Sequence, residues 1–196
     1  MSRTTLSDII QTVQGMTDAT YGQYTMGTVN YWDSDQVQKV LDRHRHDIYR
    51  EDLAVIADYV GGSVQYLEYQ SRYGNFESTN GGTAVFFIED GLGDNVGTAS
   101  YSVDYPRGRV TFTTNTQGTA YYLTGRSYDL NATAAEIWRH KASHYAVAID
   151  VSLDGNSMKR SQLMQHCLTM ADYYDQRGGP MVSTLYRSDI NDGALT

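Results

Sequence analysis

The stretches that decide the fold are GGSVQYLEYQ at residues 61–70 and YSVDYPRGRVTF at residues 101–112. In both, apolar or aromatic side chains alternate with polar ones, which is the period of a half-buried β-strand. The alternation continues across residues 61–125 and is interrupted by turns rich in glycine, asparagine and aspartate. We therefore predict an antiparallel sheet, with strands near residues 63–70, 83–89, 98–104, 109–114 and 119–124.

Helical periods flank this region on both sides. The spacing predicts a first helix over residues 4–14, and a second that begins at Asp33, where Gln36 is placed to complete a capping box, and continues past Ile48. A third helix is expected from Asp129 to about residue 149. A fourth would be capped by Ser157 and end before Gly178-Gly179-Pro180.

These elements together predict an α+β chain. Its body would be a bundle of about four α-helices, formed by residues 1–60 and 126–180. An antiparallel β-subdomain would be inserted at residues 61–125, with Gly61-Gly62 as the hinge into it. Residues 181–196 lack a helical or strand period and are predicted to form a C-terminal extension.

Composition excludes several classes of protein. The chain has 196 residues, a single cysteine (Cys167) and no apolar block long enough for a signal peptide or membrane span, so we expect a protein made in the cytoplasm, without disulfides or a membrane partner. Its formal net charge is -8. Binding to DNA or RNA requires positive side chains that neutralise the phosphates, and this chain is negative overall, so specific DNA or RNA binding is disfavoured.

The sequence motifs that could serve catalysis or metal binding are not specific. Glu136, His140 and His144 lie along one helical face at a spacing that permits a metal, but Lys141 sits among them and a solvated face is the better interpretation. The loop containing Asp90 and Asp94 lacks the register of a calcium loop. Nucleophile elbows and phosphate-binding loops are absent from the sequence, and Cys167 falls on an apolar stripe. We expect no catalytic residue, cofactor or metal, although a spatial pair of carboxylates, as in glycosidases, stays open.

Seventeen tyrosines are unusual for a chain of this length. Tyrosine is common in strands and protein interfaces, so much of the surface is expected to contact other proteins. The alternative is a monomeric carbohydrate-binding module or hydrolase with a tyrosine-lined sheet face. Its candidate side chains are Tyr66, Tyr69, Tyr101, Tyr121 and Tyr122.

Several segments occur in an order that is similar to a known family. The first two are Tyr31-Trp32-Asp33, followed by Val37 and Leu41, and Tyr73-Gly74-Asn75-Phe76. The next two are Asp104-Tyr105-Pro106-Arg107-Gly108-Arg109 and Tyr121-Tyr122-Leu123-Thr124-Gly125. The last group is Tyr128-Asp129-Leu130, Ala134-Ala135, Ile137-Trp138, Lys141-Ala142, then Arg160-Ser161-Gln162, Cys167, Met170-Ala171 and Tyr174. Across residues 31–177 the chain resembles the head-tail connector proteins of tailed bacteriophages, also called neck adaptor or head-completion proteins.

The resemblance implies a non-enzymatic subunit of the virion neck, assembled in the host bacterial cytoplasm. Twelve copies would form a closed ring below the portal protein and link the DNA-filled head to stopper or tail proteins. The genome would pass through the ring without specific binding, past an acidic wall that repels phosphate. A stopper or a tail terminator is the nearest rival; such proteins are expected to lack two long closing helices.

Two sets of contact residues are predicted. The C-terminal extension is expected to reach the portal through Met181, Val182, Leu185, Tyr186 and Ile190, a role carried over from the family by position only. The basic end of the second predicted helix is expected to meet an acidic surface of the neighbouring subunit. Its residues are Arg43, Arg45, His46 and Arg50.

Overall fold

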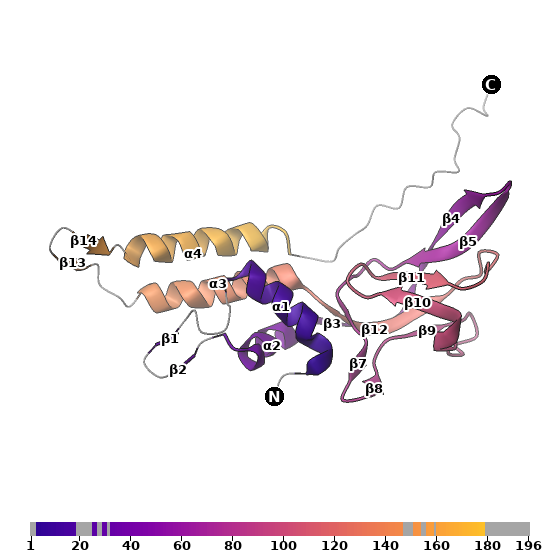
Figure 1. The fold of residues 1–196 in the computed structure, drawn as a ribbon, viewed down its shortest axis with the longest axis horizontal. Coiled ribbons are helices and arrows are strands. Elements are labelled where there is room, and N and C mark those ends of the chain that lie inside the picture. Colours follow the sequence, from indigo (N-terminus) through magenta and orange to yellow (C-terminus); the bar gives the residue numbers. More distant parts are fainter. Residues whose placement is uncertain are drawn as a thin grey trace, which may run out of the picture. The chain divides into compact units, whose positions relative to one another are not determined.

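The computed structural model describes residues 3–18, 25–26, 29–30, 32–146, 151–153, 156–158 and 160–178. The chain divides into two compact units (Figure 1). One comprises Met1–Arg45 with Asp129–Gly179 and is mainly helical; the other contains His46–Tyr128 and is mainly β. No helix in these described ranges is both long and apolar enough to span a membrane.

The helical unit contains four α-helices and one 3₁₀ turn within its described residues. They are η1 (Thr4–Leu6), α1 (Ser7–Met16), α2 (Ser34–Arg43), α3 (Leu130–Ala146) and α4 (Arg160–Asp175). Two short hairpins accompany them: β1 (Thr25–Met26) with β2 (Val29–Asn30), and β13 (Val151–Leu153) with β14 (Asn156–Met158).

The predicted capping box at the start of α2 is confirmed. The Asp33 carboxylate accepts a hydrogen bond from the Gln36 backbone N–H at 2.8 Å, and the Gln36 side chain accepts one from the Asp33 N–H at 3.2 Å. Both bonds satisfy amides that the first helical turn leaves without partners. The helix then buries Val37, Val40 and Leu41 on one face.

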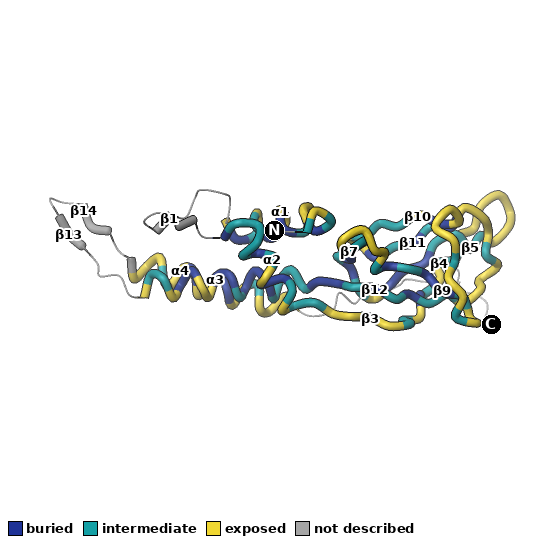
Figure 2. The backbone as a smooth tube through the Cα atoms, turned by 90° about the horizontal axis from the view of Figure 1, so that it is seen from below, coloured by how far each residue is buried: buried dark blue, intermediate teal, exposed yellow. Residues whose placement is uncertain are grey.

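The helices α3 and α4 form a hairpin whose core is narrow. Its buried cluster combines Trp138 with three small residues, Ala142, Cys167 and Ala171, which let the two helices approach closely. Figure 2 shows the buried colour concentrated on α3, which α1 and α2 also contact. The prediction that Ile137 and Trp138 are buried, with Trp138 near Tyr174, is confirmed. Leu168, expected in the same core, is exposed instead.

The β-rich unit contains two four-stranded sheets. One has the strand order β10 (Tyr101–Asp104), β11 (Arg109–Phe112), β5 (Ser63–Gln70), β4 (Ala54–Val60). The other runs β3 (Arg45–Asp52), β12 (Tyr122–Tyr128), β6 (Phe76–Glu77), with β9 (Phe87–Glu89) also paired to β12. A small hairpin, β7 (Thr79–Asn80) with β8 (Thr83–Ala84), and the 3₁₀ turn η2 (Thr98–Ser100) complete the unit.

Aromatic rings make up much of the β-rich core. Tyr69 is fully buried and contacts Phe112 and Tyr121 edge-on, with ring centroids 5.2 and 5.4 Å apart. Its hydroxyl donates to the Thr119 carbonyl at 2.7 Å. Tilted aromatic contacts of this kind stabilise a core beyond the apolar area they bury, and the hydrogen bond satisfies the buried hydroxyl.

Two of the segments that carry the family resemblance are neighbours in space. The backbone N–H groups of Asn75 and Phe76 donate to the carbonyls of Pro106 and Tyr105, each at 3.0 Å. Gly108, at φ +66°, lies so close to Tyr73 that a β-carbon would sit 2.0 Å from the Tyr73 carbonyl oxygen. Backbone hydrogen bonds and close packing between the two segments therefore account for the residues at these motif positions.

The predicted fold class is wrong. The described chain is rich in strands, and its four α-helices belong to a unit separate from the β-rich one, so it is not a four-helix bundle with an inserted β-subdomain. The error lies at residues 44–60: the second helix ends at Arg43, and β3 and β4 follow it. The strand partners of β3 and β4 override the local helical pattern, because pairing in a sheet is decided by tertiary contacts.

Two local predictions also fail. Gly61 and Gly62, both at positive φ, form the two-residue turn between β4 and β5 rather than a hinge. Ser157 lies within β14, and α4 begins at Arg160, so Ser157 does not cap it. The strand predicted at residues 63–70 is confirmed as β5.

Candidate interaction surfaces

The outer face of α4 is the first candidate surface. Within the described residues of α4, only Cys167 and Ala171 are fully buried, so most of the helix surface faces away from α3. Three large apolar side chains are on exposed positions: Leu163, Leu168 and Tyr173, each 36–44% exposed. Their spacing of five residues turns them to different sides of the helix, and Arg177 lies over the Tyr173 ring at 4.0 Å. We therefore name the exposed surface around Leu163 the α4 face. Burial raises the pKa of the Cys167 thiol, which disfavours the reactive thiolate form.

The Gly61-Gly62 hairpin is the second candidate surface. Its strands β4 and β5 extend beyond β10 and β11 in Figure 1. Near its end, Tyr59 is 71% and Val60 is 55% exposed, and Val64 is also exposed. Solvent-facing apolar side chains gathered on one hairpin indicate a contact surface.

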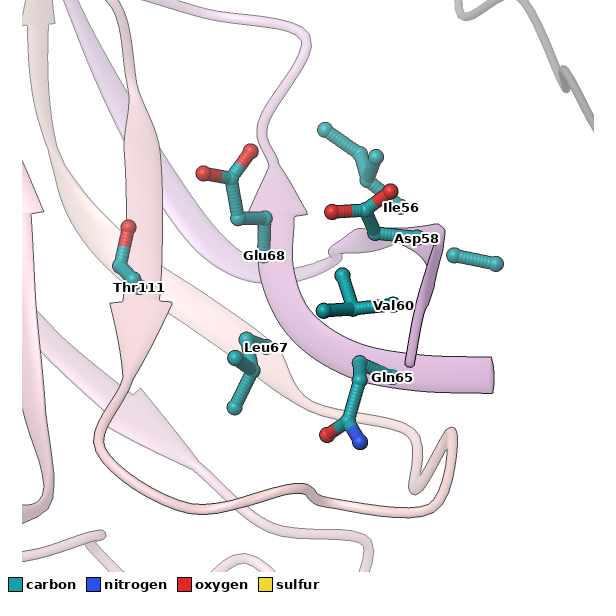
Figure 3. Close-up of a pocket in the computed structure, with 8 residues that line it drawn as sticks. Ile56, Asp58, Val60, Gln65, Leu67, Glu68 and Thr111 are labelled. Carbon is teal, nitrogen blue, oxygen red and sulfur yellow. The ribbon is translucent and has the colours of Figure 1, made fainter. Parts of the chain in front are cut away.

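A groove of about 300 Å³ runs along this hairpin (Figure 3). In that view the carboxylates of Asp58 and Glu68 lie toward one end of the groove, Leu67 and the amide of Gln65 lie toward the other, and Val60 lies between them. Glu68 forms an ion pair with Arg109 at 3.3 Å. For Asp58 the described residues provide no ion-pair partner, so its charge faces the open groove.

The predicted metal-permissive face of α3 is occupied by ion pairs. One Glu136 oxygen bonds Arg43 and lies 3.3 Å from His140, and the other lies 2.7 Å from His44. Partial burial raises the pKa of Glu136, but the hydrogen bonds from Arg43 and His44 outweigh it and hold the pKa below its usual value. In the described ranges no three His, Cys, Asp or Glu side chains are grouped to hold a metal ion.

The four basic residues predicted to contact a neighbouring subunit are not on one helix. Arg43 closes α2 and pairs with Glu136, while Arg45 is the first residue of β3. His46 is exposed in β3, its ring 6.2 Å from that of Tyr73. Arg50 lies over the Tyr122 ring at 4.8 Å and 3.8 Å from a Glu89 oxygen. The contact of these four residues with a neighbouring subunit stays a prediction.

The loop at residues 90–95 is a braced turn. One Asp90 oxygen accepts hydrogen bonds from the N–H groups of Leu92 and Asp94, at 2.9 and 3.0 Å. This is the usual role of aspartate in a tight turn.

Three of the five tyrosines named for a sugar-binding face belong to the core of the β-rich unit. Tyr69 and Tyr101 are buried, and Tyr121 stacks on Phe112 at 4.5 Å within the core. Tyr122 is covered by Arg50, and Tyr66 is half-buried beside Gly118. Tyr66 also lines a pocket of about 430 Å³ together with Val55 and Gln117. Sugar binding needs an accessible ring face, and at Tyr66 it stays a prediction.

The β4–β5 hairpin was not among the surfaces predicted from the sequence. Its signal was present, because the Gly61-Gly62 pair stands between two β-prone runs, Val55–Val60 and Val64–Leu67. A glycine pair in that setting is typical of a two-residue hairpin turn.

The predicted portal contacts at residues 181–190 lie outside the described residues.

Comparisons with known proteins do not assign the chain. No protein-family model, no curated protein and no solved structure matches it.

Proposed function

We propose that this protein is a structural adaptor subunit of a bacteriophage neck, assembled as a ring below the portal. The observation that carries the proposal is the α3/α4 hairpin. Two long antiparallel helices close the helical unit, and the sequence segments most similar to the adaptor family form their shared core. Stopper and tail-terminator proteins, the nearest rivals, are expected to lack such a pair.

The α4 face supports a role in assembly. A helix that buries only a narrow stripe against its own chain leaves apolar side chains for contact with another copy. In a ring each subunit presents one patch to a different patch on the next, so the contact need not be self-complementary. We propose that the α4 face packs against the neighbouring subunit.

In the described part of the chain, the groups that the sequence offered for chemistry are engaged in other contacts. The one cysteine is buried, the carboxylate at Glu136 is paired with three cations or imidazoles, and the candidate sugar-binding rings lie mostly in the core. These features leave protein contact as the best-supported activity for the exposed apolar surfaces.

The experiment is reconstitution on portal-bearing heads that lack a neck. The wild-type protein is expected to add a ring below the portal, seen by electron microscopy, and to retain packaged DNA. Leu163→Glu should remain folded and fail to form the ring, because it places a charge in the α4 face. Gln162→Glu adds the same charge at the adjacent exposed position and should assemble normally.

A monomeric protein that never binds such heads would contradict the proposal. Deleting residues 181–196 tests the predicted portal contact separately. The truncated protein should stay folded and lose head binding; full retention of head binding and DNA would exclude that role for the segment.

A further inference from the structure

Among the described residues, no strand pairs with the outer edge of β4. Its partner strand β5 is covered on the opposite side, where β11 pairs with residues 68–70. Further along β5, Asn115 and Thr116 continue that cover: the Tyr66 N–H donates to the Asn115 side chain, and the Thr116 N–H to the Tyr66 carbonyl, both at 3.1 Å. On the β4 side, none of the described strands pairs, so β4 ends the sheet.

Natural edge strands usually carry lysine, proline or a cover that prevents pairing with another chain. This edge has little of that protection. The sequence contains no lysine, arginine or proline between Arg50 and Arg72, and the only irregularity in its register lies between Ile56 and Asp58. The exposed Val55, Tyr59 and Val60 add apolar side chains along the same strand.

Charge decides what can occupy the edge. His46–Tyr128 holds ten Asp and Glu against five Arg and no Lys, a formal -5. Asp58 adds an unneutralised carboxylate at the groove, whereas Glu68 is paired with Arg109. Two copies placed edge to edge would bring like charges together, which destabilises cross-strand pairs. A strand carrying lysine or arginine would instead be attracted.

We propose that the β4 edge is a docking site for an extended, basic strand of a different protein. The main chain of that strand pairs with Ala54–Val60, extending the sheet by β-augmentation. Its aliphatic side chains fill the groove beside Val60 and Leu67, and a lysine or arginine meets Asp58. Because Asp58, Val60 and Leu67 line the same groove, and residues i and i+2 of a strand share a face, the recognition pattern is an aliphatic and a basic residue two positions apart.

A synthetic strand tests this directly. The probe is a blocked peptide of about eight residues, long enough to span β4, in which valine and lysine take turns at every second position, on one face, with threonine between them. It should bind the full-length protein saturably and protect the amides of residues 54–60 from hydrogen exchange. An analogue with glutamate in place of lysine should not bind.

Charge exchange on the protein provides the matched controls. Asp58→Lys should weaken binding of the lysine peptide at least about tenfold and allow binding of the glutamate peptide. Asp94→Lys makes the same charge change at an exposed loop of the same unit and should leave binding unchanged.

Three results would overturn the proposal: failure of the lysine peptide to bind, equal affinity for both peptides, or binding without protection of residues 54–60. Concentration-dependent protection of β4 without peptide would do so too, since it would make a second copy the occupant. Because the monomeric protein suffices, these outcomes do not depend on whether a ring forms.

Discussion

The ammonium group of Lys141, in α3, donates a hydrogen bond to the carbonyl oxygen of Thr17 at the C-terminal end of α1. Lys141 is only 6% exposed, and its Nζ lies 4.5 Å from the centre of the Trp138 ring. The indole N–H of Trp138 donates to the preceding carbonyl, that of Met16, at 3.2 Å. A cation at the end of a helix, bonded to a carbonyl that the helix leaves free, stabilises that terminus. Neighbouring side chains of α3 thus hold α1 in place.

Lys141→Met is expected to change how stability depends on pH. Burial lowers the pKa of Lys141 in the folded protein, and the nearby Asp18 offsets this only in part. Between that lowered value and 10.5 the unfolded chain binds more protons, so the free energy of unfolding contributed by this group rises with pH. The methionine variant lacks this rise.

Denaturant unfolding of both proteins from neutral pH to beyond 10.5, the unfolded value, measures the difference. Lys39→Met, which removes an exposed lysine from α2, should follow the wild-type curve. Parallel curves for wild type and Lys141→Met would show that burial does not lower the pKa of Lys141.

Trp138→Ala is expected to destabilise the protein by about 3 to 5 kcal/mol, because it leaves a cavity between α3 and α4 and removes the bond to Met16. Trp138→Phe keeps most of the ring volume and should lose less. Circular dichroism during denaturant unfolding measures both. A Trp138→Ala protein of normal stability that only fails to assemble would place this side chain at an interface instead.

Gly108→Ala should disrupt the β-rich unit. Its new methyl group would lie 2.0 Å from the Tyr73 carbonyl oxygen and 3.0 Å from the Phe76 ring, so the expected loss exceeds about 4 kcal/mol. Gly118→Ala is the matched control, at φ +76° with its nearest neighbour 3.7 Å away. It should cost only the backbone strain, about 1 to 2 kcal/mol. Equal thermal stability of the two variants would refute the close packing of Gly108 on Tyr73.

Glu136→Gln should weaken the attachment of α2 to α3 in a pH-dependent manner. The hydrogen bonds from Arg43 and His44 lower the pKa of Glu136 despite its partial burial. A lowered carboxyl pKa contributes stability above the unfolded value of 4.5, and this contribution is lost as the pH falls through the folded value. Wild type should therefore be more stable at neutral pH and converge with the variant in acid. A constant difference at all pH values would argue against the ion pairs.

The sequence by itself determined the elements whose signals are local. The alternation at residues 63–70 and the Asp33 and Gln36 pair specify β5 and the start of α2 through neighbours a few residues away. The period around Trp138 likewise identifies the buried side of α3. Such features need only the pleat of a strand, the geometry of a cap or the turn of a helix.

Only the tertiary structure decided the rest. Arg45–Asp52 is a strand because β12, far along the chain, pairs with it, and no local pattern encodes that partner. Tyr69 is a core residue rather than a surface platform because Phe112 and Tyr121 close over it. Asp58 and the exposed side chains of β4 become a candidate surface only because the strand order places β4 at the sheet's edge. Burial and edge position depend on contacts between distant segments, which the chain acquires only when it folds.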